Sequence, residues 1–159
     1  MTVAKTLHDW LDARQLPETV LRHDHTSCSS ETAEAAHVPG RQLAKGVVLR
    51  TQDGYHLLVV IPADRMLSLE KMTSIYGGEL VLADENELKS LFPDCETGAV
   101  PVLGMAYQLP TYVDQVLFDQ DKVYFEAGDH ESLLCMSGES FAELFEEPAI
   151  GEFSQALPH

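Results

Sequence analysis

The feature that most constrains the fold is a pair of apolar runs separated by a tight-turn sequence. Residues 43–50 (LAKGVVLR) and 55–61 (YHLLVVI) are rich in aliphatic and β-branched side chains, and Gln52-Asp53-Gly54 lies between them. An Asp-Gly pair between two such runs is typical of a β-hairpin, because glycine readily adopts the positive φ angles that the turn needs. We therefore expect two antiparallel strands at the centre of a sheet.

Shorter elements surround the expected hairpin. Hydrophobic spacing and capping residues predict helices over residues 3–13, 31–36, 69–76, 85–92 and 139–145. Short strands are expected over residues 20–24, 80–82, 112–118, 123–126 and 133–136. Strands outnumber helices and do not alternate with them regularly, as they would in a doubly wound sheet. The predicted fold class is therefore α/β in the α+β sense, a mixed sheet or partial β-barrel with short helices packed around it.

The length and the ends of the chain bound its organisation. A chain of 159 residues with 45% apolar content has the usual size of one domain. We expect a single domain over residues 1–147 and a flexible C-terminal tail over residues 148–159. Lys5, His8 and Asp9 interrupt the start of the chain where a secretory signal needs an apolar core, and no apolar run is long enough to span a membrane. The expected location is the cytoplasm, with no membrane partner.

The cysteines give no sign of a redox or covalent site. Cys28, Cys95 and Cys135 are widely spaced and form no CxxC pair. This pattern favours reduced thiols over a disulfide framework or a cysteine zinc site. Asp94 and Glu96 flank Cys95, and acidic neighbours raise the pKa of a thiol. No covalent nucleophile is indicated.

Metal and nucleotide motifs are also missing. His23, His25 and His37 with Asp24 are conceivable metal ligands, but an HxH pair and a distant histidine are common by chance. The chain contains no P-loop, no GxGxxG and no HExxH motif. We therefore expect no metal and no cofactor.

The charge of the chain is unevenly distributed. The formal net charge is −16, which opposes bulk attraction to nucleic acid. Residues 1–80 hold eight Lys/Arg and ten Asp/Glu, a net of −2, whereas residues 81–159 hold two and sixteen, a net of −14. Arg22, Arg41, Lys45 and Arg50 in the first part either form a local surface for a tRNA end or another anion, or are dispersed and solvated.

Lys45 occupies an unusual position in the first predicted strand. Counting in steps of two from Leu43 places Lys45 on the same strand face as Val47 and Leu49. A buried ammonium without a partner is costly. Either the amine snorkels outward to solvent, or it faces a cleft that receives an anion.

The loop Thr97–Gly104 is the second candidate feature. Gly98 and Gly104 permit unusual backbone angles, and Pro101 stiffens the turn. Backbone amides held in such a loop bind a carbonyl oxygen or a developing oxyanion. A tight structural turn has the same composition, so this pattern alone does not decide between the two.

A third candidate feature, Glu126–His130 (EAGDH), follows a predicted strand. His130 in this segment either takes part in proton transfer or caps and solvates a turn. The residues leave both alternatives open.

Four segments occur in a characteristic order. They are residues 43–50 (LAKGVVLR), 59–63 (VVIPA), 92–101 (FPDCETGAVP) and 124–130 (YFEAGDH). In this order they resemble the YbaK/prolyl-tRNA-synthetase-associated editing family over roughly residues 20–146. Members of that family hydrolyse the ester of wrongly charged tRNAs, either as free-standing proteins or as a domain of prolyl-tRNA synthetase. The resemblance implies a YbaK-like fold and a free-standing aminoacyl-tRNA deacylase, with the tRNA acceptor end and an aminoacyl-tRNA synthetase as partners.

The resemblance also implies roles for individual residues. It makes Lys45 the catalytic residue, which contacts the terminal adenosine or its phosphate and orients the ester. It gives substrate binding to the loop that holds the aminoacyl carbonyl and to the hairpin segment, namely Gly98, Ala99, Val100, Pro101, Val102, Gly128 and His130. Because an aminoacyl ester is already activated, positioning and a ribose hydroxyl of the tRNA suffice without a side-chain base.

One departure from the family concerns the substrate pocket. The family usually has proline at the position of Val102, whereas the proline of this chain, Pro101, lies one residue earlier. The amino acid that is removed therefore stays open. An alternative function is a non-catalytic module of the same fold that binds a nucleotide, a small metabolite or a protein partner, since the acidic second half should repel a tRNA body. The oligomeric state is not indicated.

Overall fold

A computed structural model describes residues 3–17, 19–26, 29–145 and 150–158. Its main sheet has the strand order β1-β8-β7-β2-β3-β6-β9, and β5 also pairs with β2. In that order the strands span Thr19–Arg22, Ser132–Ser137, Lys122–Glu126, Leu43–Thr51, His56–Pro62, Thr111–Asp114, Ile150–Gly151 and, for β5, Leu80–Leu82. The sheet is mixed, because β2 pairs with β3 antiparallel and with β7 parallel. The expected α+β class with a mixed sheet is confirmed.

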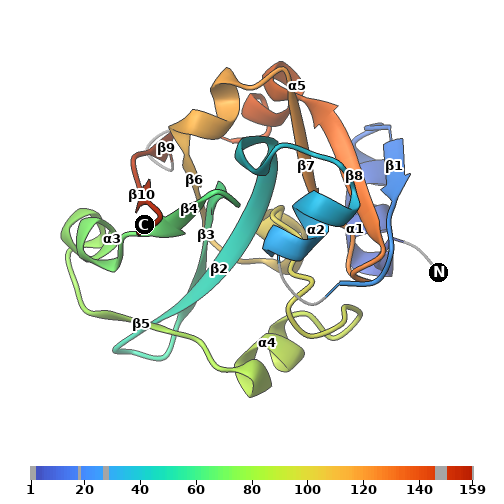
Figure 1. The fold of residues 1–159 in the computed structure, drawn as a ribbon. Coiled ribbons are helices and arrows are strands. Elements are labelled where there is room, and N and C mark those ends of the chain that lie inside the picture. The colour runs from blue at the N-terminus through green and yellow to red at the C-terminus, as the bar shows by residue number, and fades with distance from the viewer. Residues whose placement is uncertain (1–2, 18, 27–28, 146–149, 159) are drawn as a thin grey trace.

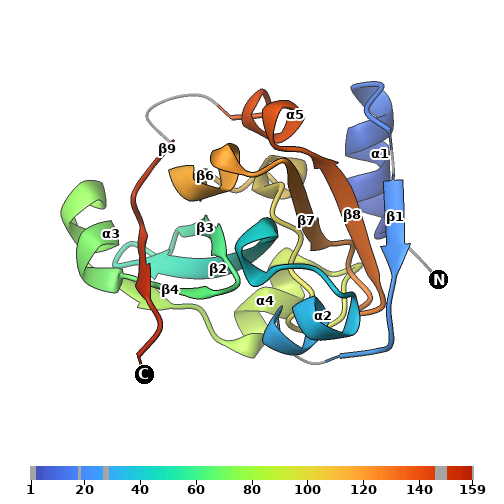
Figure 2. The same ribbon diagram turned by 45° about the horizontal axis from the view of Figure 1, so that its top comes forward.

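Short helices lie on both sides of the sheet. In Figure 1, α2 lies in front of β2 and β7 while α1 lies behind β8, and Figure 2 shows the same arrangement from another side. The helices span Lys5–Ala13 (α1), Ser29–Ala35 (α2), Leu69–Tyr76 (α3), Glu85–Leu91 (α4) and Gly138–Ala142 (α5), and the 3-10 turns span Gly40–Gln42 (η1), Gly104–Tyr107 (η2) and Gln115–Asp119 (η3). In the described part of the chain, none of these helices has the length and apolarity to cross a membrane.

Local capping signals explain where two of the helices begin and end. Ser68 Oγ accepts a hydrogen bond from Lys71 N at the start of α3, and Gly77 ends this helix with a φ of 84°. At the start of α4, Asp84 and Glu87 form the expected capping box. Such contacts span only three residues, so the sequence alone predicts them well.

The side chains of β2 divide between two cores. Ala44 and Val48 join the main core, which also contains residues of α1 and β7. Leu43 and Leu49 point to the opposite face, where smaller clusters form under α2 and α3. By the same alternation Lys45 lies on the α2 side of the sheet. The sheet is thus covered on both faces where the central hairpin crosses it.

Strand pairing is interrupted along one edge of β2. β7 pairs with this edge only at Leu43 and Ala44, and β5 takes it up again from Leu49 to Thr51. We call the place where β2 and β7 separate, after Ala44 and Phe125, the β2/β7 fork. Figure 1 shows the two strands diverging there, with α2 in front of them.

The C-terminal segment differs from the expected flexible tail. β9 pairs with β6, and β10 (Ser154–Ala156) pairs with β4 (Arg65–Leu67). Phe153, between β9 and β10, is 1% exposed and packs edge-on against Tyr112. Residues 150–156 are therefore strapped to the domain, because one aromatic side chain completes a core cluster. Residues 148 and 149 lie outside the described part of the chain.

The segment 112–118 is only partly a strand. β6 ends at Asp114, and the following residues form η3. The Asp114 side chain accepts a hydrogen bond from Val116 N over 3.1 Å, which starts the turn. The apolar composition of residues 115–118 favours a strand, but this local side-chain contact prevails.

Candidate active site

A lysine on β2 and a glutamate on β7 are the first residues beyond the paired positions of the β2/β7 fork. Ala44 and Phe125 are the last paired residues, and Lys45 and Glu126 follow them on the two strands. Both side chains lie by alternation on the face covered by α2. Lys45 is half-buried, whereas Glu126 is only 7% exposed. Sequence analysis selected Lys45 but not Glu126.

Glu126 is held from α2. Thr32 Oγ1 donates to Glu126 Oε1 over 3.2 Å and lies 2.5 Å from Thr26 Oγ1. The other carboxyl oxygen, Oε2, is buried and has no hydrogen-bond partner within the described part of the chain. Burial raises the pKa of Glu126, an effect that the neighbouring His130 and His23 rings partly offset. The carboxyl group is thus fixed in place with one oxygen unused.

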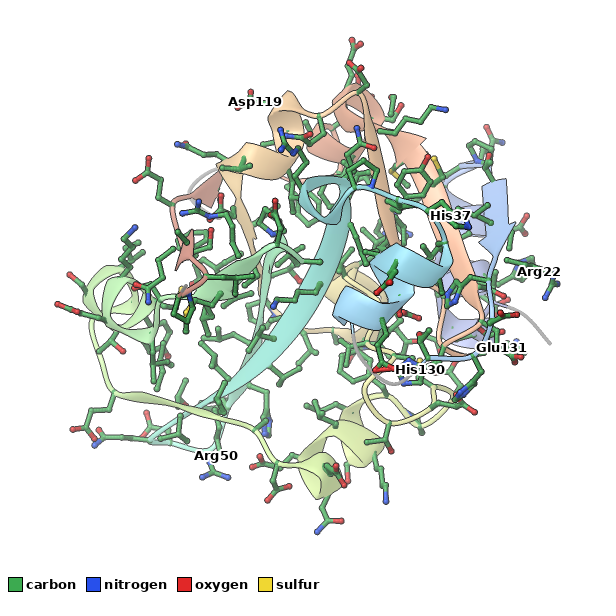
Figure 3. The ribbon with its side chains drawn as sticks, viewed as in Figure 1. Arg22, His37, Arg50, Asp119, His130 and Glu131 are labelled. Carbon is green, nitrogen blue, oxygen red and sulfur yellow. The ribbon has the colours of Figure 1, made fainter. Side chains whose placement is uncertain are left out.

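His130 anchors the loop that was predicted to bind substrate. Glu96 N donates to Gly128 O over 2.7 Å, and His130 Nε2 lies 2.8 Å from Thr97 O. Because a carbonyl oxygen only accepts, Nε2 is the donor of this bond. His130 is 5% exposed and has a φ of 58°. Figure 3 shows His130 close to α2 and the loop.

Both glycines of the predicted site have backbone angles that favour glycine. Gly98 has a φ of 88°, and a Cβ built on it would lie 3.5 Å from His130 Nε2. Gly128 has a φ of 115°, and a Cβ there would lie 3.0 Å from Ala4 Cβ and 3.1 Å from Cys95 Sγ. Gly98 therefore borders the candidate site, whereas Gly128 allows the hairpin to pack closely against α1 and the loop.

The rest of the loop is buried and supports the site from behind. Ala99, Val100, Pro101 and Val102 are all buried, and both valines belong to the main core. A Cβ built on Gly46 would lie 3.2 Å from Val100 Cγ1, so the glycine lets the loop pack against β2 directly after Lys45. Val102 was expected to shape the substrate pocket, and its side chain is completely buried.

Several backbone amides of the loop, those of Gly98 and Val100 among them, have no protein acceptor within the described residues. Ala99 N donates to Glu96 O over 3.0 Å and closes a turn. Gly98 is exposed, whereas Val100 is buried, and a buried amide usually has an acceptor. These two donors are therefore suited to a carbonyl oxygen of a ligand.

An open hollow of about 550 Å³ lies at the loop. Its volume is in the range of sites that hold small molecules. It is lined by His25, Thr26, Lys89, Cys95, Glu96, Thr97 and His130. His130 links this hollow to the loop, whereas Lys45 does not line it in the part of the chain that the structure describes.

The pattern of motifs on this fold matches a known family. The profile described as "Aminoacyl-tRNA editing domain" matches residues 23–144, which contain the fork, the loop and His130. The chain belongs to the aminoacyl-tRNA editing domain family. No curated protein is significantly similar to it.

Solved structures agree with this editing-domain fold. The hypothetical protein APE2540 superposes with a TM-score of 0.81 at 26% identity, covering 95% of this chain and 100% of that protein. A candidate trans-editing enzyme for prolyl-tRNA synthetase superposes with a TM-score of 0.82 at 23% identity, covering 96% and 97%. A candidate signal transduction protein from Marinobacter aquaeolei VT8 gives 0.73 at 20% identity, where the match covers 94% of this chain but 30% of that one.

The hollow of this editing domain combines basic and acidic groups. His25 Nε2 lies 2.9 Å from Glu96 Oε2, and this hydrogen bond raises the pKa of His25. The His25 ring also meets the His130 ring edge-on, with 5.6 Å between their centroids. Lys89 of α4 adds a second basic side chain to the lining. Neither His25 nor Lys89 was singled out as a substrate-binding candidate from the sequence.

Among the described cysteines, none is an activated thiol at the editing-domain site. Burial raises the pKa of Cys95 to about 12, so the thiol stays protonated at neutral pH. Cys95 and Cys135 are free, and Cys28 lies outside the described residues. In the described ranges, no group of three or more His, Cys, Asp or Glu side chains has the geometry of a metal site.

The start of the loop is fixed by Asp94. Its carboxylate accepts from Thr6 N over 2.7 Å and from Tyr107 Oη over 3.0 Å. Partial burial opposes ionisation of Asp94, but these hydrogen bonds outweigh it and lower its pKa. The start of the loop is thereby tied both to α1 and to η2. Both bonds join residues distant in the sequence, which explains why no sequence pattern indicates them.

Proposed function

We propose that this chain is a free-standing aminoacyl-tRNA deacylase that hydrolyses the ester of mischarged tRNA. The observation that carries the proposal is the fork itself. There the loop packs against Gly46 on the main-core face of β2, and Lys45 projects from the opposite face; within the described residues the N–H groups of Gly98 and Val100 have no protein acceptors. Membership of the editing-domain family supports the same chemistry.

In the proposed reaction the loop holds the aminoacyl carbonyl. The N–H groups of Gly98 and Val100 bind the carbonyl oxygen and stabilise the negative charge that develops on it when water attacks. A donor placed this way contributes about two to three powers of ten in rate. Water adds to the carbonyl carbon, the bond to the ribose oxygen breaks, and the products are the free amino acid and uncharged tRNA.

Lys45 orients the tRNA end in this proposal. Its ammonium binds the terminal adenosine or its phosphate, which places the ester over the loop. The protonated Cys95 is a poor nucleophile, so we assign the attack to water, with a ribose hydroxyl of the tRNA as proton acceptor. His130 acts by holding the loop through Thr97 O. No cofactor takes part.

The acidic surface bears on how tRNA approaches. Residues 81–159 carry a net charge of −14, so we propose that only the acceptor end is contacted, with a synthetase as a second partner that delivers it. Activity should then depend weakly on salt, because few phosphates are bound. As a translation-quality enzyme the protein acts in the cytoplasm.

The deciding experiment is a deacylation assay with purified protein and a panel of mischarged tRNAs. Lys45→Ala should lower the rate at least about 100-fold for the best substrate. Lys122→Ala is the matched control, because Lys122 is an exposed lysine at the far end of β7. Absence of ester loss above the buffer rate for every tRNA would overturn the proposal.

A non-catalytic module is the second candidate function. The strongly acidic second half of the chain favours it, since this half should repel a tRNA body. In that case adenosine-type ligands should raise the melting temperature while no mischarged tRNA is hydrolysed. The same panel of tRNAs therefore separates the two candidates.

A further inference from the structure

Glu126 is a buried carboxylate with an unused oxygen. It is 7% exposed, and its only hydrogen bond within the described residues comes from Thr32 to Oε1. Oε2 has no partner. Leaving a buried charged acceptor unpaired is unfavourable, so such a group calls for an explanation in terms of a missing donor.

The two histidine rings that act on Glu126, in contrast to Thr32, supply acceptors rather than donors. His130 Nε2 donates to Thr97 O, so Nδ1 of the neutral ring is an acceptor, and it is buried without a partner. His23 Nδ1 lies 2.7 Å from Asp24 O, which leaves Nε2 as an acceptor that is also buried and unpartnered. Both rings interact electrostatically with Glu126. Within the described residues, neither of these ring nitrogens therefore forms a hydrogen bond to Glu126 Oε2.

The bound group must therefore bring its own protons. A metal ion is the usual alternative for two histidines and a carboxylate, but the described residues contain no group with metal-site geometry. A primary ammonium has three N–H donors and a positive charge. It complements the negative charge of Glu126 and can supply a donor to Oε2.

We propose that Glu126 binds the α-ammonium group of the aminoacyl ester. This inference rests on the proposed deacylase function and names its substrate class: esters with a free α-amino group, as opposed to N-blocked or peptidyl esters. The other groups assigned to the substrate, Lys45 and the loop amides, are all donors and cannot receive an ammonium. Glu126 follows directly after the last residue that pairs with β2, so it lies at the fork where the ester is held.

The first test needs no substitution. For each ester that the wild-type protein hydrolyses, kcat/KM is compared with that of the N-acetylated form on the same tRNA. A charge-assisted hydrogen bond in a buried site predicts a preference of about 10- to 100-fold for the free amine. Equal rates would overturn the inference and leave the deacylase function standing.

The second test uses matched neutral variants. Glu126→Gln should lower kcat/KM for the free-amine ester about 10- to 100-fold and leave the N-acetyl ester nearly unchanged, so that the preference disappears. Asp114→Asn, which neutralises a buried carboxylate in the same sheet, should keep the wild-type preference. A Glu126→Gln variant that retains the preference contradicts the inference, and circular dichroism establishes that both variants are folded.

A binding measurement distinguishes failure of the inference from failure of the deacylase function. The probes are 3′-alanylamido-adenosine, in which a stable amide replaces the ester, and its N-acetyl derivative. Calorimetry should show at least about 10-fold tighter binding of the free amine to the wild-type protein, and loss of this difference in Glu126→Gln. If no tRNA ester is hydrolysed, this comparison still decides whether Glu126 binds an ammonium, and equal affinities would refute it.

Discussion

Two carboxylates of the same sheet are both buried, and they differ in how fully they are hydrogen-bonded. Asp114, 1% exposed, accepts from Val116 N, Phe153 N and Ser154 Oγ over 3.1, 3.0 and 2.7 Å. Glu126, 7% exposed, accepts only from Thr32 within the described residues. The first carboxylate is saturated by its own chain and fastens the C-terminal strap. The second is held at one oxygen, which leaves the other for a ligand.

The contrast teaches that burial alone does not identify a functional acid. A buried carboxylate stabilises a fold when the chain supplies hydrogen-bond donors to it. The same group destabilises the fold when those donors are missing. Neutral isosteres of the two residues should therefore have opposite effects on stability and on activity. Unfolding and deacylation measurements on Asp114→Asn and Glu126→Gln compare these effects directly.

Asp114→Asn should lower the free energy of unfolding by about 2–4 kcal/mol. The substitution weakens three charge-assisted hydrogen bonds and turns an NH2 group toward donors. Urea unfolding monitored by circular dichroism measures the change. Proteolysis should also release residues 150–158 first, because these bonds hold the strap. A change below about 0.5 kcal/mol would mean that the strap is not fastened by Asp114.

Glu126→Gln should not lower the free energy of unfolding. At pH 8 it should raise this free energy by about 1 kcal/mol. The glutamine keeps an oxygen for Thr32, removes a buried charge, and offers an N–H to the neighbouring acceptors. The same urea titration measures it. A loss of stability as large as that of Asp114→Asn would abolish the distinction between the two carboxylates.

The sequence predicts the parts of the fold that depend on residues close together in the chain. The hairpin, the capping box of Asp84 and Glu87, and the end of α3 at Gly77 are all local, and they are confirmed. The strap was missed, because its anchor Phe153 is buried only when the C-terminal segment packs back against the sheet. No pattern of neighbouring residues indicates that packing. From the sequence, residues 148–159 were expected to form a flexible tail.

The candidate site likewise contains residues that the sequence indicated and one that it did not. The resemblance of spaced motifs selected Lys45 and the loop, and the structure brings Gly98 into contact with His130. The roles assigned to these residues stay predictions. Glu126 has no local signal, because a glutamate at the end of a strand is usually solvated. Its burial follows from packing of α2 over β7, which the sequence does not reveal.

The pH dependence of stability should differ between wild-type protein and Glu126→Gln. Burial raises the pKa of Glu126 in the folded state above its usual range, so the folded state binds more protons than the unfolded state. The penalty for the buried charge is fully present above the raised pKa, and it is relieved as the pH falls through that value. The roughly 1 kcal/mol advantage of Glu126→Gln at pH 8 should therefore shrink toward pH 5. An advantage that grows on acidification would contradict the raised pKa.

Asp94 is intermediate between the two carboxylates, because it is exposed but has two donors from the chain. Tyr107→Phe removes one donor, and it should lower the free energy of unfolding by about 0.5–1 kcal/mol. It should also slow deacylation about threefold, because the loop that carries Gly98 loses its tie to η2. Deacylation kinetics and urea unfolding of the same preparation check both values. If Tyr107→Phe slows the reaction as strongly as Glu126→Gln, the loop and the free carboxylate oxygen do not have separate roles.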